Sequence, residues 1–128
     1  MNQKRLLVVV SVILLGGALF ARQQSSAPMM VYGVGTASCG TWTEARERAR
    51  TDRMDVRPVQ FETWAEGYMT AYGEYAPAAL TAAGRWERKT DSAGMKGFLD
   101  NYCKDNPTKS FWLAVREFVR EQGGRISP

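Results

Sequence analysis

The chain has 128 residues, with 17 basic and 13 acidic side chains, a net charge of +4 and no histidine. This length leaves room for one small domain with a modest core behind an N-terminal export signal. Without histidine, the chain lacks the usual catalytic base of serine and cysteine hydrolases and a common zinc ligand. We therefore expect a protein that is not an enzyme and that holds no cofactor and no metal ion.

Residues 1–21 have the organisation of an export signal. Lys4 and Arg5 precede an uncharged apolar stretch that ends at Ala21, and this stretch is shorter than the roughly 20 residues of a membrane-spanning helix. We expect cleavage after Ala21, a periplasmic or secreted location, and no stable membrane insertion afterwards. Retention of the segment as an anchor is the alternative, because Leu19 is larger than the small residue usual at that position.

The charge pattern argues against a nucleic-acid partner. Loss of the signal would leave 15 basic and 13 acidic residues, a net charge of +2. Arginines and acidic residues are interleaved from Glu44 to Asp55, as on the solvated surface of a helix. Such a surface lacks the clustered basic residues that DNA or RNA binding requires.

Residues 22–38 precede the expected helical domain, which spans residues 39–122 and is followed by a polar tail at 123–128. Residues 22–28 form a polar leader, and residues 29–38 are apolar with Gly33 and Gly35. This composition predicts an extended segment laid against the core.

The first two helices are predicted from a cap and a proline. Thr41 and Glu44 have the spacing of a capping box, which predicts a helix start there, with Trp42, Ala45 and Ala49 facing inward. Pro58 suits the first turn of a second helix. An aromatic stripe follows at steps of three and four, made of Phe61, Trp64, Tyr68, Ala71, Tyr72 and Tyr75. Gly67 within it predicts the close approach of another backbone, with residues 31–35 as the candidate.

The third and fourth helices repeat an apolar pattern after a weakly patterned stretch, residues 73–90, in which one helical turn is expected around residues 78–83. Asp91 or Ser92 can cap the third helix, and Asn106 with Pro107 ends it and can cap the fourth. The expected buried positions are Met95, Phe98, Leu99, Tyr102 and Cys103 in the third helix, and Phe111, Val115, Phe118 and Val119 in the fourth. The predicted fold class is all-α, a small four-helix domain.

Cys39 and Cys103 are the only cysteines, and in an exported chain they predict one disulfide. A metal pair and a redox pair are the competing interpretations, but the two residues are not in a CxxC motif and no histidine is present. The bond would join the start of the first helix to the end of the third.

Candidate functional residues are few. Glu62, Glu66 and Glu74 could supply a glycosidase pair, but their positions favour solubilising charges on the second helix. Trp42, Trp64 and Trp112 lie on or near apolar stripes and are expected to pack in the core. Trp86 has charged neighbours on both sides, so we name Trp86, Arg85 and Arg88 as candidate partner contacts, in a surface that includes the loop over residues 74–90. The alternative is that Trp86 folds back over the core.

The motifs around both cysteines resemble those of the HdeA/HdeB family of periplasmic acid-stress chaperones. The matching positions are Cys39-x-x-Trp42, Trp64-x-x-Gly67-Tyr68, and Leu99-x-x-Tyr102-Cys103-Lys104-x-Asn106-Pro107 followed by Phe111 and Val115. The resemblance implies a small, exported, helical protein with one disulfide, which exposes apolar helix faces to unfolded clients at low pH. Residues 29–38 and 73–90 are additions to this pattern, so the dimer interface of the family is not carried over.

The Gly67-Tyr68 and Asn106-Pro107 pairs are also similar to those of Tai-type periplasmic immunity proteins, which neutralise type VI secretion effectors. That resemblance implies a folded protein that binds one toxin at neutral pH. Under either resemblance the partner is a protein, either unfolded clients or an effector.

Overall fold

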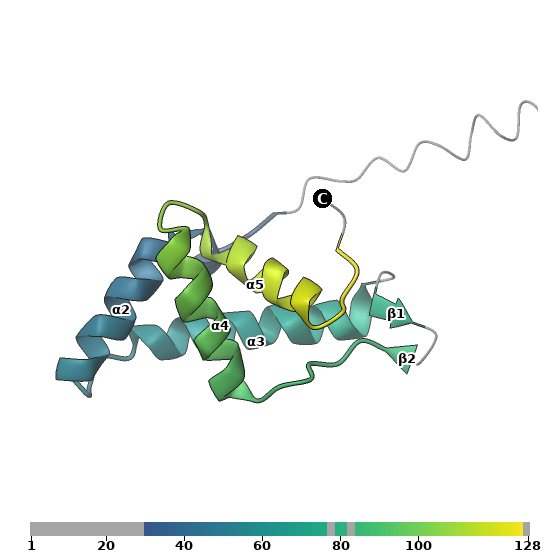
Figure 1. Ribbon diagram of the computed structural model, residues 1–128, viewed down its shortest axis with the longest axis horizontal. Helices are drawn as coiled ribbons and strands as arrows, with labels where there is room; N and C mark the ends of the chain where they lie inside the picture. Colours follow the sequence, from purple (N-terminus) through teal and green to yellow (C-terminus); the bar gives the residue numbers. More distant parts are fainter. Residues whose placement is uncertain (1–29, 77–78, 82–83, 127–128) are drawn as a thin grey trace, which may run out of the picture. The chain divides into compact units, whose positions relative to one another are not determined.

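Four α-helices follow one another along residues 30–76, 79–81 and 84–126, the part of the chain that the computed structural model describes (Figure 1). They are α2 (Cys39–Thr51), α3 (Arg57–Tyr75), α4 (Ser92–Asp105) and α5 (Phe111–Glu121). A short 3-10 helix, η1 (Gly33–Thr36), comes first, and strands β1 (Leu80–Thr81) and β2 (Gly84–Arg85) form a small antiparallel hairpin after α3. The predicted all-α class is confirmed, whereas the predicted signal, the polar leader and the last two residues of the tail lie outside the described residues.

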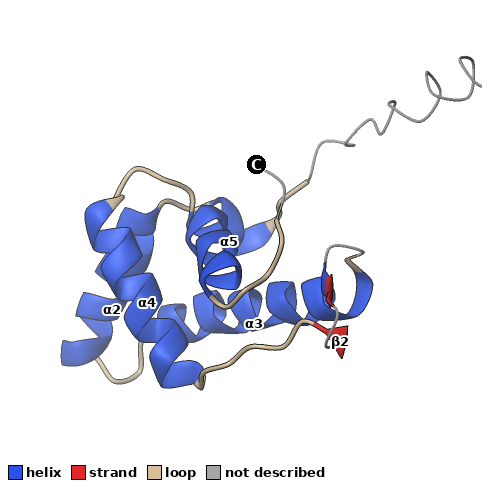
Figure 2. Cartoon of the chain, turned by 45° about the vertical axis from the view of Figure 1, so that its right-hand side comes forward, coloured by secondary structure: helices blue, strands red, loops and turns tan. Residues whose placement is uncertain are grey.

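The long helix α3 supports the other elements. It packs against α2, α5 and η1, while α4 packs against α2 and α5. The ribbon shows α2 and α4 side by side at one end of α3 and the hairpin at the other end (Figures 1 and 2). The described residues from Val31 onward form one compact unit, and the core residues identified in it lie between Val34 and Ile126.

Helix α2 begins earlier than predicted. Its N-cap is Ser38, whose hydroxyl accepts a hydrogen bond from the Thr41 amide at 3.2 Å, so the predicted capping box at Thr41 and Glu44 is wrong. The preceding amides are also satisfied, because the Cys39 and Gly40 N–H groups donate to the Lys109 and Pro107 carbonyl oxygens at 2.7 and 2.8 Å. The loop before α5 therefore supplies the acceptors that let α2 start at Cys39.

The buried face of α3 differs from the predicted aromatic stripe. Pro58 lies in the first turn as predicted, and Phe61 and Tyr72 are buried. Trp64 and Tyr68 are only partly buried, however, and Ala71 and Tyr75 are exposed, the latter by 82%. Ala65 and Met69 are buried instead. Phe61, Ala65, Met69 and Tyr72 lie three or four residues apart, so they form the one face of α3 that packs against its partners.

Within the segment predicted to be extended, residues 29–38, Gly33–Thr36 form a 3-10 turn, whereas Tyr32, Ala37 and Ser38 have extended backbone. Gly33 has a φ of +65°, which starts η1 in a conformation that side chains rarely adopt. A Cβ on Gly35 would lie 2.2 Å from Trp64 Cζ2, and the Trp64 indole N–H donates to the Tyr32 carbonyl oxygen at 2.9 Å. Close backbone approach was predicted at Gly67, but nothing lies within 4 Å of a Cβ there. The segment does reach α3, but Gly35 is the glycine that permits it.

Helices α4 and α5 agree more closely with the predicted pattern. The Asp91 carboxylate caps α4 by accepting from the Gly94 amide at 2.8 Å. Asn106 ends α4 as predicted, but Ser110, not Asn106, is the N-cap of α5. The fully buried positions of these two helices are Met95, Leu99 and Cys103 in α4, and Phe111, Ala114, Val115, Phe118 and Val119 in α5.

The aromatic core lies where α2, α3 and α5 meet. The Trp42 ring centroid is 5.7 Å from that of Phe61 and 5.5 Å from that of Phe111, and the two phenylalanine rings are 4.8 Å apart in an edge-to-face arrangement. Such pairs add stability beyond the burial of their area. This cluster fixes the three helices against one another next to the disulfide.

Candidate functional site

The predicted disulfide between Cys39 and Cys103 is confirmed. It joins the first residue of α2 to α4 with a Cα–Cα distance of 4.7 Å, and neither cysteine has any exposed surface. Its sequence separation is 64 residues, for which chain-entropy reasoning gives about 4 kcal/mol of stabilisation. Because the thiols are paired and buried, the bond links two helices and offers no accessible thiol.

Trp86 is a core residue, so the alternative in which it folds back is the one observed. Only 7% of its surface is exposed, its ring packs edge-to-face on Tyr72 at 5.3 Å, and its indole N–H donates to the Gln122 carbonyl oxygen at 3.3 Å. A tryptophan that closes the end of the core in this way is not a free anchor for a partner. The charged residues next to Trp86 in sequence predict neither contact, because Tyr72 and Gln122 are distant along the chain.

Arg85, Trp86 and Arg88 nevertheless line one groove together with α3. The groove has a volume of about 400 Å³, and its wall from α3 consists of residues at helical spacing. We call it the α3–Trp86 groove and define it by Glu66, Met69, Thr70, Gly73, Glu74, Arg85, Trp86, Glu87 and Arg88. The three predicted contact residues are thus brought together, with Arg85 exposed, Arg88 partly buried and Trp86 forming part of the wall.

Two arginines of the groove are held by partners within it. Arg88 Nη1 lies 3.5 Å from Glu66 Oε1, which also accepts a hydrogen bond from the Ser92 hydroxyl at 2.9 Å. Arg85 donates to the Gly73 carbonyl oxygen at 3.2 Å, at the C-terminal end of α3 where a positive charge is favourable. Glu74 and Glu87 are exposed and have no ion pair among the described residues. The groove therefore presents two available carboxylates beside two positioned guanidinium groups.

The backbone that forms the second wall of the groove is hydrogen-bonded to the residue before β1 and to the residue after α5. The Trp86 amide donates to the Ala79 carbonyl oxygen at 2.8 Å, and the Lys89 amide donates to the Gln122 side chain at 3.1 Å. A Cβ on Gly73 would lie only 3.0 Å from the Trp86 carbonyl oxygen. The absence of a side chain at Gly73 therefore allows the connection to run against α3 and sets the depth of the groove.

Sequence reasoning missed the contribution of α3 to this site. The sequence favours Glu66 as a solubilising charge over a member of a glycosidase pair, and it does not indicate Met69, Thr70 or Gly73 as contact residues. These residues and Glu74 recur at i, i+3, i+4, i+7 and i+8, which places them on one face of a helix. The spacing was a usable signal, but only the observed path of residues 84–90 shows that this face has an opposing wall.

Within the described ranges, no three cysteine or carboxylate side chains gather where they could hold a metal ion. Among the described helices, none has both the length and the apolar character needed to cross a membrane. Comparison of the chain with family models, curated proteins and solved structures gives no match.

Proposed function

We propose that the protein is an exported, non-enzymatic binding protein that recognises one protein partner through the α3–Trp86 groove while fully folded. The observation that carries this proposal is the convergence of Arg85, Trp86 and Arg88 with Glu66 and Glu74 around one groove. An immunity protein that neutralises a secreted effector toxin is the function that fits such a fixed, neutral-pH binding surface best.

The composition of the groove and its margin supports a protein partner. Two exposed apolar side chains lie next to groove residues, Tyr75 after Glu74 and Leu80 opposite Arg85 in the hairpin, with 82% and 49% of their surfaces exposed. Tyrosine and arginine are enriched in the residues that contribute most to protein interfaces. The hydrogen bonds to Gln122 hold the groove wall in place before binding, which lowers the entropy cost of association.

The disulfide supports an oxidising compartment, since structural disulfides form and persist in secreted and periplasmic proteins. Together with the export signal expected at residues 1–21, this favours the periplasm. An effector that acts in the cell envelope would meet the protein there.

The experiment is capture of the partner at pH 7 from envelope extracts of competing cells, with the disulfide-bonded protein immobilised. The groove variant Glu74→Lys with Glu87→Lys changes two exposed carboxylates that have no ion pair among the described residues. The control variant Glu47→Lys with Asp105→Lys makes the same charge change on α2 and α4, away from the groove. We expect one protein to be captured by the wild type and the control but not by the groove variant. Equal capture by both variants would refute the groove as the binding site.

An acid-stress chaperone is the second candidate. The observation that favours it is that three ion pairs link separate elements of the fold. Arg46 pairs with Asp100 between α2 and α4, Lys96 lies 3.6 Å from Glu62 between α4 and α3, and Arg88 pairs with Glu66. Protonation of these carboxylates would remove all three links and leave the positive charges unopposed, while the disulfide would still hold α2 to α4. The apolar faces of α3 and α5 would then become available to unfolded clients.

Dye binding and suppression of client aggregation, measured from pH 7 to pH 2, test the chaperone candidate separately. A gain of both on acidification would support it. Absence of any gain would eliminate it and leave the neutral-pH proposal unaffected.

A further inference from the structure

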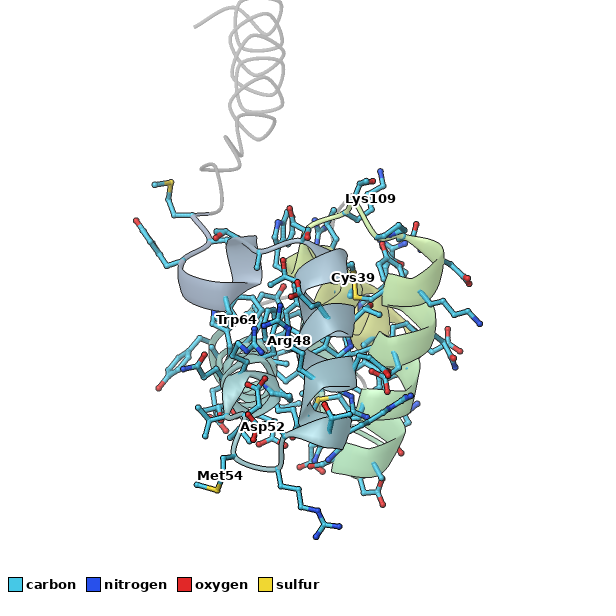
Figure 3. All side chains as sticks on the ribbon, turned by 90° about the vertical axis from the view of Figure 1, so that its left-hand side faces the viewer. Cys39, Arg48, Asp52, Met54, Trp64 and Lys109 are labelled. Carbon is cyan, nitrogen blue, oxygen red and sulfur yellow. A yellow bond between two sulfur atoms is a disulfide. The ribbon has the colours of Figure 1, made fainter. Side chains whose placement is uncertain are left out.

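The corner between α2 and α3 displays apolar side chains to solvent. Met54, Val56 and Val59 expose 84%, 61% and 58% of their surfaces. They are three of the seven large apolar side chains found exposed among the described residues, and all three fall within six positions of the sequence. Figure 3 shows Met54 projecting from this end of the helix pair, away from the core.

Hydrogen bonds hold the backbone of the corner, so the exposure of these side chains follows from the conformation of the turn. The Asp52 carboxylate accepts from the Met54 amide at 3.0 Å, and the Asp55 carboxylate accepts from the Arg57 amide at 3.0 Å. The Asp55 amide in turn donates to the Asp52 carbonyl oxygen at 3.1 Å. These bonds fix the backbone that holds Met54 and Val56 outward, and neither side chain is among the residues of the hydrophobic core.

Positive charge surrounds the apolar side chains. Residues 44–59, which include the acidic partners of two arginines on α2, contain five arginines and four acidic residues, a net charge of +1. Both aspartates accept hydrogen bonds from backbone amides of the turn, and Asp55 also pairs with Arg57. Arg53 is exposed and has no carboxylate partner among the described residues.

The remaining acidic neighbours are Glu44 and Glu47, which pair with Arg48 and Arg50 on the surface of α2. All four side chains of these two pairs are more than half exposed. Exposed ion pairs of this kind are weak, so the two guanidinium groups can exchange a carboxylate for a phosphate, which arginine binds through paired hydrogen bonds.

We propose that this corner docks on an anionic lipid bilayer, with Met54, Val56 and Val59 entering the interface and Arg48, Arg50 and Arg53 contacting lipid phosphates. The exposed guanidinium groups of the corner favour lipid phosphates, and the combination of apolar and basic side chains is the one that binds peripheral proteins to membranes. The side chains lie at a projecting turn, and a fluid interface can receive them without a matched pocket. The inference is independent of the partner proposed for the groove, which lies toward the other end of α3.

The test is co-sedimentation of the chain from Arg22 onward, which retains the whole described core, with vesicles of phosphatidylglycerol or of phosphatidylcholine. The apolar variant is Met54→Ser with Val56→Ser and Val59→Ser, and the charge variant is Arg50→Gln with Arg53→Gln. The control is Tyr75→Ser with Leu80→Ser, which removes exposed apolar side chains elsewhere. All substituted positions are exposed, so each variant should retain the wild-type circular dichroism spectrum and thermal midpoint.

We expect the wild type and the control to bind phosphatidylglycerol vesicles at least about tenfold more tightly than phosphatidylcholine vesicles, with binding weakened by salt. The apolar variant should bind at least about tenfold more weakly than the wild type, because each lost side chain removes part of the buried apolar area, and the charge variant should lose much of its preference for the anionic lipid. Equal binding by the wild type and the apolar variant would overturn the proposal. So would self-association of the wild type that the apolar variant abolishes in the absence of vesicles, because a second copy would then cover this corner.

Discussion

Arg46 of α2 and Asp100 of α4 form a bidentate ion pair that links the same two helices as the disulfide. Arg46 Nε and Nη2 donate to the two carboxylate oxygens of Asp100 at 3.1 and 2.9 Å, and the hydrogen bond to Asp100 raises the pKa of Arg46. Each side chain is about one third exposed, at 32% and 35%. One covalent link and one polar link thus hold α2 to α4.

Removing these two links should have very different effects. Replacing both cysteines, Cys39→Ala with Cys103→Ala, should lower the free energy of unfolding by about 4 kcal/mol, because the unfolded chain loses the constraint of a long loop. Asp100→Asn should cost about 1 kcal/mol or less, because solvent screens a partly exposed pair. Urea unfolding at pH 7 measures both. A loss with Asp100→Asn as large as that with the cysteine variant would contradict this ranking.

Gly35 and Gly67 should respond in opposite ways to alanine. At Gly35 the new Cβ would overlap the Trp64 ring, at 2.2 Å from Cζ2, whereas at Gly67 it would meet nothing within 4 Å. Gly35→Ala should therefore destabilise the fold by about 1–3 kcal/mol, and Gly67→Ala should stabilise it by up to about 1 kcal/mol through helix propensity. Thermal unfolding of the two variants decides the matter. Destabilisation by Gly67→Ala would indicate a contact that the described residues do not account for.

Trp86→Ala should strongly destabilise the protein. The substitution removes the edge-to-face contact with Tyr72 and the hydrogen bond to Gln122, and it opens a cavity at the end of the core, for a loss of about 3–5 kcal/mol. The adjacent exposed residue serves as a control, since Glu87→Ala should change stability by no more than about 0.5 kcal/mol. Unchanged stability in Trp86→Ala would mean that this tryptophan is a surface anchor after all.

Asp55 should make the stability of the protein fall in strong acid. Hydrogen bonds from the Arg57 side chain, and then from the Arg57 amide, lower the pKa of Asp55 from 3.8 to about 2. Because the folded-state pKa lies below the unfolded value, the ionised carboxylate stabilises the fold above pH 3.8, and this contribution is lost as the pH falls through about 2. Asp55→Asn should thus be less stable than the wild type at pH 7, with the difference narrowing between pH 4 and pH 2. A difference that stays constant over that range, or an Asp55 carboxyl that titrates near pH 4 by NMR, would contradict the assignment.

Local patterns predicted much of the fold, while contacts distant in sequence accounted for most of the errors. Pro58, the Asp91 cap, the disulfide and most of the buried residues of α4 and α5 follow from spacing and residue type. Phe98 and Tyr102, also predicted to be buried, are only partly buried. The start of α2 depends instead on carbonyl groups of Pro107 and Lys109, and the glycine that contacts α3 depends on where Trp64 lies. Neither dependence is visible in a local window of sequence.

The candidate site shows the same division. Arg85, Trp86 and Arg88 were identified because charged residues flank a tryptophan, but burial of Trp86 results from Tyr72 and Gln122, which are far from it in sequence. The facing wall on α3 follows from the path of the connection across Gly73. The sequence could therefore indicate one wall of the groove, but the opposing wall required the tertiary structure.

The affinity of the captured partner for the protein, measured by isothermal titration at pH 7, tests the proposed function most directly. Binding should be at least about 100-fold weaker in the groove variant, Glu74→Lys with Glu87→Lys, as expected when two contacts of about 1.4 kcal/mol each are lost. The control, Glu47→Lys with Asp105→Lys, should bind within about threefold of the wild type. Equal affinities for the two variants, or a partner that binds only after the protein has been acidified, would contradict recognition through the α3–Trp86 groove.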